Sequence, residues 1–200
     1  GYRINLSELE KVVSKKTALL VITNPHAPTG VTSSRDELEE IGELAEKYGF
    51  YVVCDEIYAE FDRGRVPTMF SVNPRWGITT TSFDKAYGLG GLKAGVALAS
   101  EELVEQLFSN VVSTTGSGSN LVELALIDLL TKGREAMERH KRRWRETRER
   151  TVKWLGDAED ITYTPNEIGV VFWLELRKIR DTYRWTNRFT IPRMEMATVP

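Results

Sequence analysis

Residues 50–58 read Phe50-Tyr51-Val52-Val53-Cys54-Asp55-Glu56-Ile57-Tyr58, and this stretch decides the fold class. Its apolar run, 50–54, is typical of a buried strand and ends directly in polar side chains. The same arrangement occurs twice more, where 18–23 precedes Asn24-Pro25-His26-Ala27-Pro28-Thr29-Gly30 and 78–81 precedes Ser82-Phe83-Asp84-Lys85. Because the loops at the ends of parallel strands converge on a crevice where ligands bind, we expect these polar groups to form one site.

Helical and strand patterns alternate along the chain, which predicts a three-layer α/β fold with a mostly parallel sheet and helices on both faces. The expected helices are 7–16 with Ser7 as N-cap, one capped by Ser34 or Asp36 that ends at Tyr48, 101–108, one that ends at Leu130 after a loop at 113–119, and 134–155. The expected strands are 18–23, 51–54, 78–82, 95–99, 161–163 and 169–176, the last two in a second, smaller layer.

Composition indicates a protein without a membrane or nucleic-acid partner. The 200 residues carry a formal net charge of −2, and 28 % of them are charged, so no polyanion partner is implied. The longest apolar runs are far shorter than the ~20 residues of a membrane span, and no signal peptide is visible. The one cysteine, Cys54, excludes an internal disulfide and fits a reducing cytosol, so we expect a cytoplasmic location.

A basic cluster at 139–145 resembles a nucleic-acid patch at first sight. Acidic residues interleave with it, namely Glu135, Glu138, Glu146 and Glu149. A solvated helix with ion pairs between residues four apart is therefore the favoured interpretation. His26 and His140 lie far apart and lack metal-ligand spacing, so we expect no metal site.

In order and spacing, the three strand-end segments resemble the fold-type I aminotransferases that use pyridoxal 5'-phosphate, in the class I/II branch. That family's lysine signature is a small, an apolar and a small residue, then Lys, Gly-Leu, and an Arg eight residues beyond the Lys. The chain supplies Ser82-Phe83-Asp84-Lys85, Gly88-Leu89 and Lys93. It departs at Asp84, where a small residue is usual, at Lys93, where Arg is usual, and at Ala27, where Asn is common. The resemblance covers about 20–155.

The resemblance implies a role for each of four polar side chains. Lys85 would form an imine with the cofactor aldehyde and then move protons at the substrate Cα. Asp55 would pair with the pyridinium nitrogen, so that the ring withdraws electrons. Tyr58 and Asn24 would donate hydrogen bonds to the cofactor's phenolic oxygen.

Each of these residues also has a simpler interpretation. Lys85 could be an ordinary surface lysine, and Asp55 could cap a helix that begins at Glu56. Tyr58 could be a core aromatic, and Asn24 could only start the turn before Pro25. Such a turn suits a cis peptide bond, which we expect between Asn24 and Pro25.

Ser82 and Lys93 occupy the positions that bind the cofactor phosphate in this family. A lysine keeps the positive charge of the usual arginine but loses its planar fork. Asp84 could pair with Lys93 and leave the phosphate short of positive charge, so weak cofactor binding is expected.

The resemblance predicts transamination between an amino acid and a 2-oxo acid by a homodimer, on a seven-stranded sheet whose one antiparallel strand is 95–99. We divide the chain into a partial large domain at 1–133, a connecting helix at 134–155 and a partial small domain at 156–200. The alternatives are a non-catalytic remnant, one half of a split enzyme that needs a complementing half-chain, or a lyase or decarboxylase on the same fold.

The chain begins at Gly1 without a Met, and no segment corresponds to the family's glycine-rich phosphate cup or to the aromatic that stacks on the cofactor. We therefore expect a fragment that lacks the N-terminal part and most of the C-terminal domain, and one side of its sheet should be uncovered. Arg188 and Arg193 are the candidates for binding a substrate carboxylate, although no surrounding motif supports either.

Overall fold

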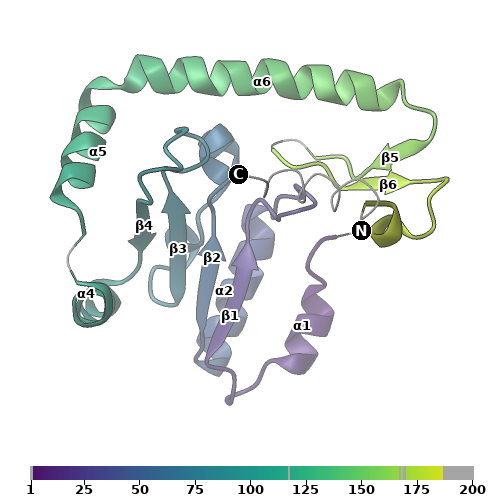
Figure 1. Ribbon diagram of the computed structural model, residues 1–200. Coiled ribbons are helices and arrows are strands. Elements are labelled where there is room, and N and C mark those ends of the chain that lie inside the picture. The colour runs from purple at the N-terminus through teal and green to yellow at the C-terminus, as the bar shows by residue number, and fades with distance from the viewer. Residues whose placement is uncertain (1, 117, 167, 169, 187–200) are drawn as a thin grey trace.

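A four-stranded sheet forms the centre of the protein (Figure 1). The computed structural model describes residues 2–116, 118–166, 168 and 170–186. The strands are β1 (Leu19–Thr23), β2 (Tyr51–Asp55), β3 (Gly77–Ser82) and β4 (Gly95–Leu98), in the order β1-β2-β3-β4. The first three are parallel and β4 is antiparallel to β3, which confirms the strand direction expected for 95–99.

Helices α1 (Leu6–Val12), α2 (Arg35–Tyr48) and α3 (Met69–Val72) contribute to the main hydrophobic core on one face of the sheet. Leu38, Ile41 and Ala45 of α2 are fully buried with Val52 and Cys54 of β2. Their spacing puts the three α2 residues on one stripe of the helix, which is why α2 lies flat on the sheet.

Helix α2 begins and ends where its sequence predicts. The Ser34 side chain accepts the N–H of Glu37, and the Glu37 carboxylate accepts the N–H of Ser34, which forms a capping box. The helix ends at Gly49, which has a φ of 77°. Of the two predicted caps, the structure selects Ser34 rather than Asp36.

The predicted bounds of two helices are wrong, and α1 ends at Val12 instead of at residue 16. Helix α1 is capped by Asn5 instead of Ser7, because the Asn5 side chain accepts the N–H of Glu8. Helix α4 (Glu101–Thr115) continues beyond residue 108 into the predicted loop. The hydroxyls of Ser113 and Thr115 donate to carbonyls three and four residues earlier in the helix, so these residues need no loop to satisfy them.

Three helices extend around the sheet (Figure 1). After α4, helix α5 (Asn120–Lys132) rises to α6 (Arg134–Gly156), which passes along the end of the sheet where β1, β2 and β3 finish. Both later helices start close to the predicted positions. The mostly parallel sheet flanked by helices confirms the predicted α/β class.

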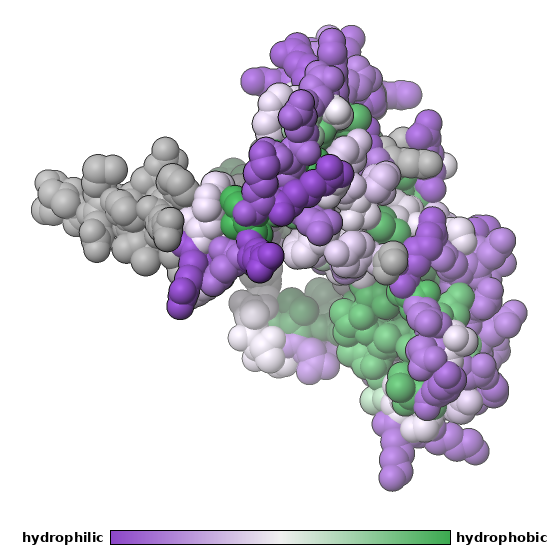
Figure 2. Space-filling view, turned by 90° about the vertical axis from the view of Figure 1, so that its right-hand side faces the viewer, coloured by the Kyte–Doolittle hydropathy of each residue, from purple (hydrophilic) through white to green (hydrophobic). Residues whose placement is uncertain are grey.

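The sheet face opposite α2 carries exposed apolar side chains. Leu20 and Ile22 pack into the core, so the alternation of a strand places Leu19 and Val21 on the other face. Leu19 is 51 % exposed and Val21 63 % exposed. Figure 2 shows a hydrophobic patch on the side of the molecule where β1 forms the sheet edge.

A separate hairpin follows α6. Strands β5 (Ile161–Tyr163) and β6 (Leu174–Leu176) pair antiparallel, as the predicted smaller layer requires. Strand β6 starts later than the predicted strand at 169–176, whose Gly169 lies outside the described residues. Trp173 donates its indole N–H to the hydroxyl of Tyr2 at 2.9 Å, so the hairpin contacts the beginning of the chain.

Among the helices that the structure describes, none combines the length and the hydropathy that crossing a bilayer requires.

Candidate active site

The strand register brings the first two predicted site residues together. Thr23 of β1 is the partner of Asp55 in β2, and the N–H of Asn24 donates to the Asp55 carbonyl at 2.9 Å. Asp55 is in turn the partner of Thr80 in β3, two residues before Ser82. The polar segments that follow the three strands therefore lie at the same end of the sheet, where β1, β2 and β3 finish, as predicted.

Asn24 is fully buried and keeps one polar atom without a partner. Its Oδ1 accepts the N–H of Ser33 at 2.9 Å, whereas its Nδ2 has no hydrogen-bond acceptor in the described part of the chain. A buried donor left unpaired costs about 1–3 kcal/mol, so an acceptor brought to this amide would be bound favourably. The bond between Asn24 and Pro25 is cis, as predicted, and so is the one between Ala27 and Pro28, which was not predicted.

Asp55 and Tyr58 are half-buried at the end of β2. The Asp55 Oδ1 accepts the N–H of Ile57 at 3.1 Å, which is a local turn interaction of the kind that a capping residue makes. No α-helix begins at Glu56, since the segment after β2 is a turn followed by a 3-10 helix at Ala59–Arg65. The Tyr58 hydroxyl makes no hydrogen bond to a described residue, so it is available to a ligand.

Glu56 is a buried carboxylate whose role the sequence patterns did not indicate. Its Oε1 accepts the N–H of Met69 at 2.8 Å and the hydroxyl of Thr79 at 2.9 Å. These contacts tie α3 to the core face of β3. The alternation of strand β2 was a usable signal, because it places Glu56 on the core side when Asp55 is on the open side.

Lys85 lies in a folded loop between β3 and β4. The N–H of Gly88 donates to the Lys85 carbonyl at 3.1 Å, and the N–H of Leu89 donates to the Phe83 carbonyl at 3.1 Å. The Lys85 side chain is exposed and makes no ion pair with a described residue. Its amine is therefore accessible, which both the catalytic and the surface interpretation allow.

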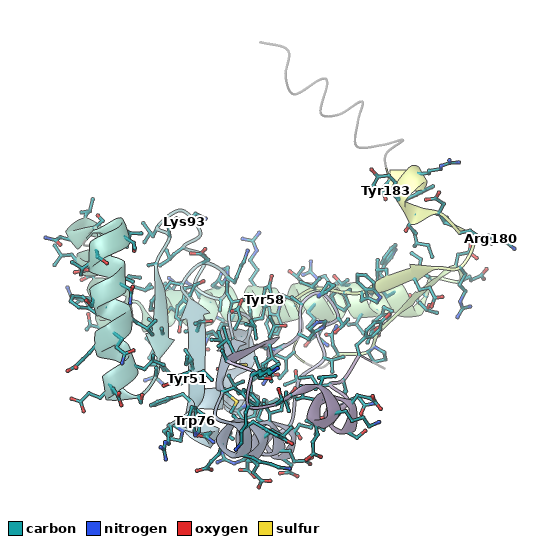
Figure 3. All side chains as sticks on the ribbon, turned by 90° about the horizontal axis from the view of Figure 1, so that it is seen from below. Tyr51, Tyr58, Trp76, Lys93, Arg180 and Tyr183 are labelled. Carbon is teal, nitrogen blue, oxygen red and sulfur yellow. The ribbon has the colours of Figure 1, made fainter. Side chains whose placement is uncertain are left out.

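The phosphate-binding candidates are Ser82 and Lys93. The Ser82 hydroxyl oxygen accepts the N–H of Asp84 at 3.2 Å, which leaves its proton for another acceptor. Lys93 has a φ of 53° and a side chain that is 79 % exposed. In Figure 3, Lys93 and Tyr58 lie in the part of the molecule that holds the sheet, whereas Arg180 and Tyr183 lie at the other end.

Asp84 forms the predicted pair with Lys93. The distance from its Oδ2 to the Lys93 Nζ is 3.9 Å. The other carboxylate oxygen, Oδ1, is buried and has no hydrogen-bond donor among the described residues. The cation expected to bind phosphate therefore already faces a carboxylate.

Helix α6 covers the lysine loop with part of its basic segment. The Lys141 Nζ lies 6.0 Å from the centre of the Tyr87 ring, and Trp144 packs on Phe61 with ring centres 4.8 Å apart. Arg139 pairs with Glu135 at 2.6 Å, an ion pair between residues four apart as expected. The segment thus has a packed side and a solvated side.

Asn166 is a second residue that the sequence patterns missed. Its side chain lies against Gly30, where an added Cβ would be 2.6 Å from the Asn166 Nδ2. That Nδ2 donates to the Thr29 carbonyl at 3.5 Å, and Arg148 of α6 donates to the Asn166 carbonyl. No local pattern could have found a contact across 137 residues. Arg188 and Arg193 lie outside the described residues.

The profile of the family described as aminotransferase class I and II matches residues 1–191. The chain belongs to this family. It is 28 % identical over 160 residues to a putative aminotransferase, YugH, of Bacillus subtilis, covering 78 % of the chain and 42 % of that protein. It is 30 % identical over 181 residues to histidinol-phosphate aminotransferase 2 of Archaeoglobus fulgidus, covering 86 % of the chain and 50 % of that protein.

Solved structures of the aminotransferase family share the fold. A PLP-dependent aminotransferase from Streptococcus suis superposes with a TM-score of 0.81 at 23 % identity, covering 94 % of the chain and 51 % of that structure. A mutant of Thermus thermophilus aspartate aminotransferase gives a TM-score of 0.74 at 23 % identity, covering 82 % and 46 %. The chain thus spans about half the length of the aminotransferases it matches.

Members of the aminotransferase family generally use pyridoxal phosphate, and the residues present here fit its ring. The unpaired Asn24 amide after β1 supplies a donor, Asp55 at the end of β2 a carboxylate, and Lys85 in the loop after β3 an accessible amine. The fit to the phosphate is poorer, because Lys93 is paired with Asp84.

Proposed function

We propose that this chain is the lysine-bearing part of an aminotransferase that binds pyridoxal 5'-phosphate and transfers an amino group between an amino acid and a 2-oxo acid. The unpaired amide of Asn24, held beside Asp55 by a backbone hydrogen bond, carries the proposal. A buried donor next to a carboxylate that faces the open side of the sheet suits a heteroaromatic ligand with a basic nitrogen and an anionic oxygen.

When bound, the cofactor supplies an aldehyde that takes up an amino group and a ring that withdraws electrons. Lys85 would hold the cofactor through its amine and move a proton to and from the substrate Cα. Asp55 would accept a hydrogen bond from the protonated ring nitrogen and keep the proton there. Asn24 and Tyr58 would donate to the phenolic oxygen.

Residues 1–133 are assigned to a partial large domain, 134–155 to the connecting helix and 156–200 to a partial small domain. A cytoplasmic location stays a prediction.

Because lyases and decarboxylases can use the same groups, incubation with alanine, aspartate or aromatic donors and 2-oxoglutarate separates the reactions. Amino transfer forms glutamate, whereas a lyase or decarboxylase would consume the donor without forming it.

A homodimer or a complementing half-chain is also proposed, and exposed apolar residues support it. On α4 they recur at helical spacing, namely Val104, Leu107, Phe108 and Val111, and on α5 they include Leu121, Leu124, Ile127 and Leu130. Exposed apolar stripes of this extent are typical of surfaces that another polypeptide covers. A remnant that binds the cofactor weakly remains the alternative if no such partner restores activity.

Reductive labelling tests the cofactor proposal. Pyridoxal phosphate is added to the chain, borohydride fixes any cofactor held by an amine, and peptide mass analysis locates it. Label on the peptide that contains Lys85, absent from Lys85→Ala, is the expected result. Lys132→Ala is the matched control, because that lysine is also exposed but lies on α5. Label spread over surface lysines, unchanged in Lys85→Ala, would overturn the proposal.

A further inference from the structure

The loop between β3 and β4 carries a negative charge that works against a phosphate ligand. Asp84 directly precedes Lys85, and its Oδ2 lies 3.9 Å from the Lys93 Nζ. We infer that Asp84 is a specificity-determining residue, which partly offsets the charge of Lys93 and makes this site discriminate only weakly between phosphorylated and unphosphorylated pyridoxal. The inference rests on the proposed function and adds a selectivity to it.

The two partners differ in how firmly they are placed. The Asp84 side chain is 22 % exposed and that of Lys93 is 79 % exposed. The Asp84 backbone is also held, because its N–H donates to the Ser82 hydroxyl oxygen at 3.2 Å. An enclosed charge is screened less by solvent than an exposed one, so the carboxylate influences this loop more strongly than Lys93 does.

The unpaired Oδ1 strengthens this argument. It is buried without a donor from any described residue, so it retains an uncompensated partial charge inside the loop. A phosphate that reached the Ser82 hydroxyl would approach the same turn, because Ser82 and Asp84 are hydrogen-bonded neighbours. It would meet repulsion from Asp84 together with attraction from Lys93.

Other charges near the loop come from the 3-10 helix, where the Glu60 carboxylate accepts the Tyr87 hydroxyl at 3.0 Å, and from α6. His140 lies against Gly88, since an added Cβ there would be 3.4 Å from its Cε1, and the Lys141 Nζ lies over the Tyr87 ring. Besides Lys85, the described cations here include Lys93 on the loop itself and Lys141, which reaches Tyr87 from α6. A carboxylate that partly offsets the charge of Lys93 therefore weakens the attraction for phosphate more than the attraction for the pyridine ring.

The test compares the dissociation constants of pyridoxal phosphate and pyridoxal in the full chain, measured by the absorbance of the bound chromophore. Asp84→Asn keeps the shape of the side chain and removes its charge. We expect it to tighten pyridoxal phosphate binding by about tenfold and to change pyridoxal binding by less than about twofold. In the Asp84→Asn variant the ion pair between Asp84 and Lys93 is absent. Adding Lys93→Ala to this variant should therefore weaken the binding of pyridoxal phosphate but not that of pyridoxal.

Two further variants complete the design. Asp128→Asn removes another aspartate paired with a lysine, at 2.5 Å on α5, and should leave both constants unchanged. Asp84→Ser is a smaller replacement that carries the test if Asp84→Asn does not fold. Raising the salt concentration should reduce the gain for pyridoxal phosphate, because the effect is electrostatic.

The outcomes separate this inference from the function on which it rests. If pyridoxal phosphate labels Lys85 but the ratio of the two constants is the same with and without Asp84, the specificity role is wrong and the cofactor proposal stands. If the Asp84 variants bind pyridoxal phosphate more weakly, Asp84 helps to hold the phosphate and the inference is reversed. If neither compound reaches Lys85 in any variant, both proposals are overturned.

Discussion

The backbone N–H of Asn24 donates to the carbonyl of Asp55 at 2.9 Å, so the residues that end two neighbouring strands are held in register. This bond extends the β1–β2 pairing by one residue beyond Thr23. It fixes a buried amide beside a half-buried carboxylate, and neither side chain contributes to the bond itself. Neither side chain is therefore needed for this backbone bond.

Replacing Asn24 by Ala should lower the stability of the loop that follows β1 and should also weaken ligand binding. The loop loses the hydrogen bond from Ser33, which costs about 1 kcal/mol in the free energy of unfolding. Pyridoxal phosphate binding should also weaken, because the Nδ2 donor is absent. Urea unfolding measures the first effect and titration of the bound chromophore the second. Ser33 donates through its backbone, so Ser33→Ala is a control that should preserve both.

Replacing Asp55 by Asn should leave the fold intact and weaken cofactor binding. The amide oxygen of Asn can still accept the Ile57 N–H, so unfolding should change by less than about 0.5 kcal/mol. If Asp55 pairs with the ring nitrogen as proposed, loss of its charge should weaken pyridoxal phosphate binding by about 10- to 100-fold. Unchanged affinity in a folded Asp55→Asn protein would show that Asp55 is only a turn residue.

Replacing Glu56 by Ala should destabilise the protein strongly. The change leaves the Met69 N–H and the Thr79 hydroxyl without their acceptor inside the core, at a cost of about 2–4 kcal/mol. Glu56→Gln retains an oxygen acceptor and should cost less. Glu8→Ala is the matched surface control, because Glu8 and its partner Lys11 are both exposed and such pairs contribute little. Similar unfolding midpoints for Glu56→Ala and Glu8→Ala would refute the core role.

Replacing Gly30 by Ala should disrupt the contact between Asn166 and the loop that follows β1. The new Cβ would lie 2.6 Å from the Asn166 Nδ2, at a backbone φ of +74° that disfavours side chains. We expect a loss of about 1–3 kcal/mol in the free energy of unfolding. The double variant Gly30→Ala, Asn166→Ala should recover the part due to the clash but not the part due to φ. Strictly additive effects of the two changes would show that the residues do not interact.

Much of the fold and part of the site could be predicted from local patterns. The three apolar runs were sufficient for β1, β2 and β3, and a capping residue at Ser34 or Asp36 with an end at Tyr48 was sufficient for α2, because each depends on neighbours within a few residues. Helix α4 was predicted too short, since Ser and Thr side chains read as loop-forming although they can bond back to their own helix. The strand ends also predicted that the polar segments lie together at one end of the sheet, whereas the roles of their residues stay predictions.

The sequence by itself determined which chemical groups follow each strand, because a run of apolar residues and its polar end are local features. The tertiary structure decided which of those groups are satisfied. Only the folded chain shows that Asn24 keeps a free buried donor and that Asn166 lies against Gly30. Burial and long-range contacts depend on segments far apart in the chain, and no local pattern records the distance between them.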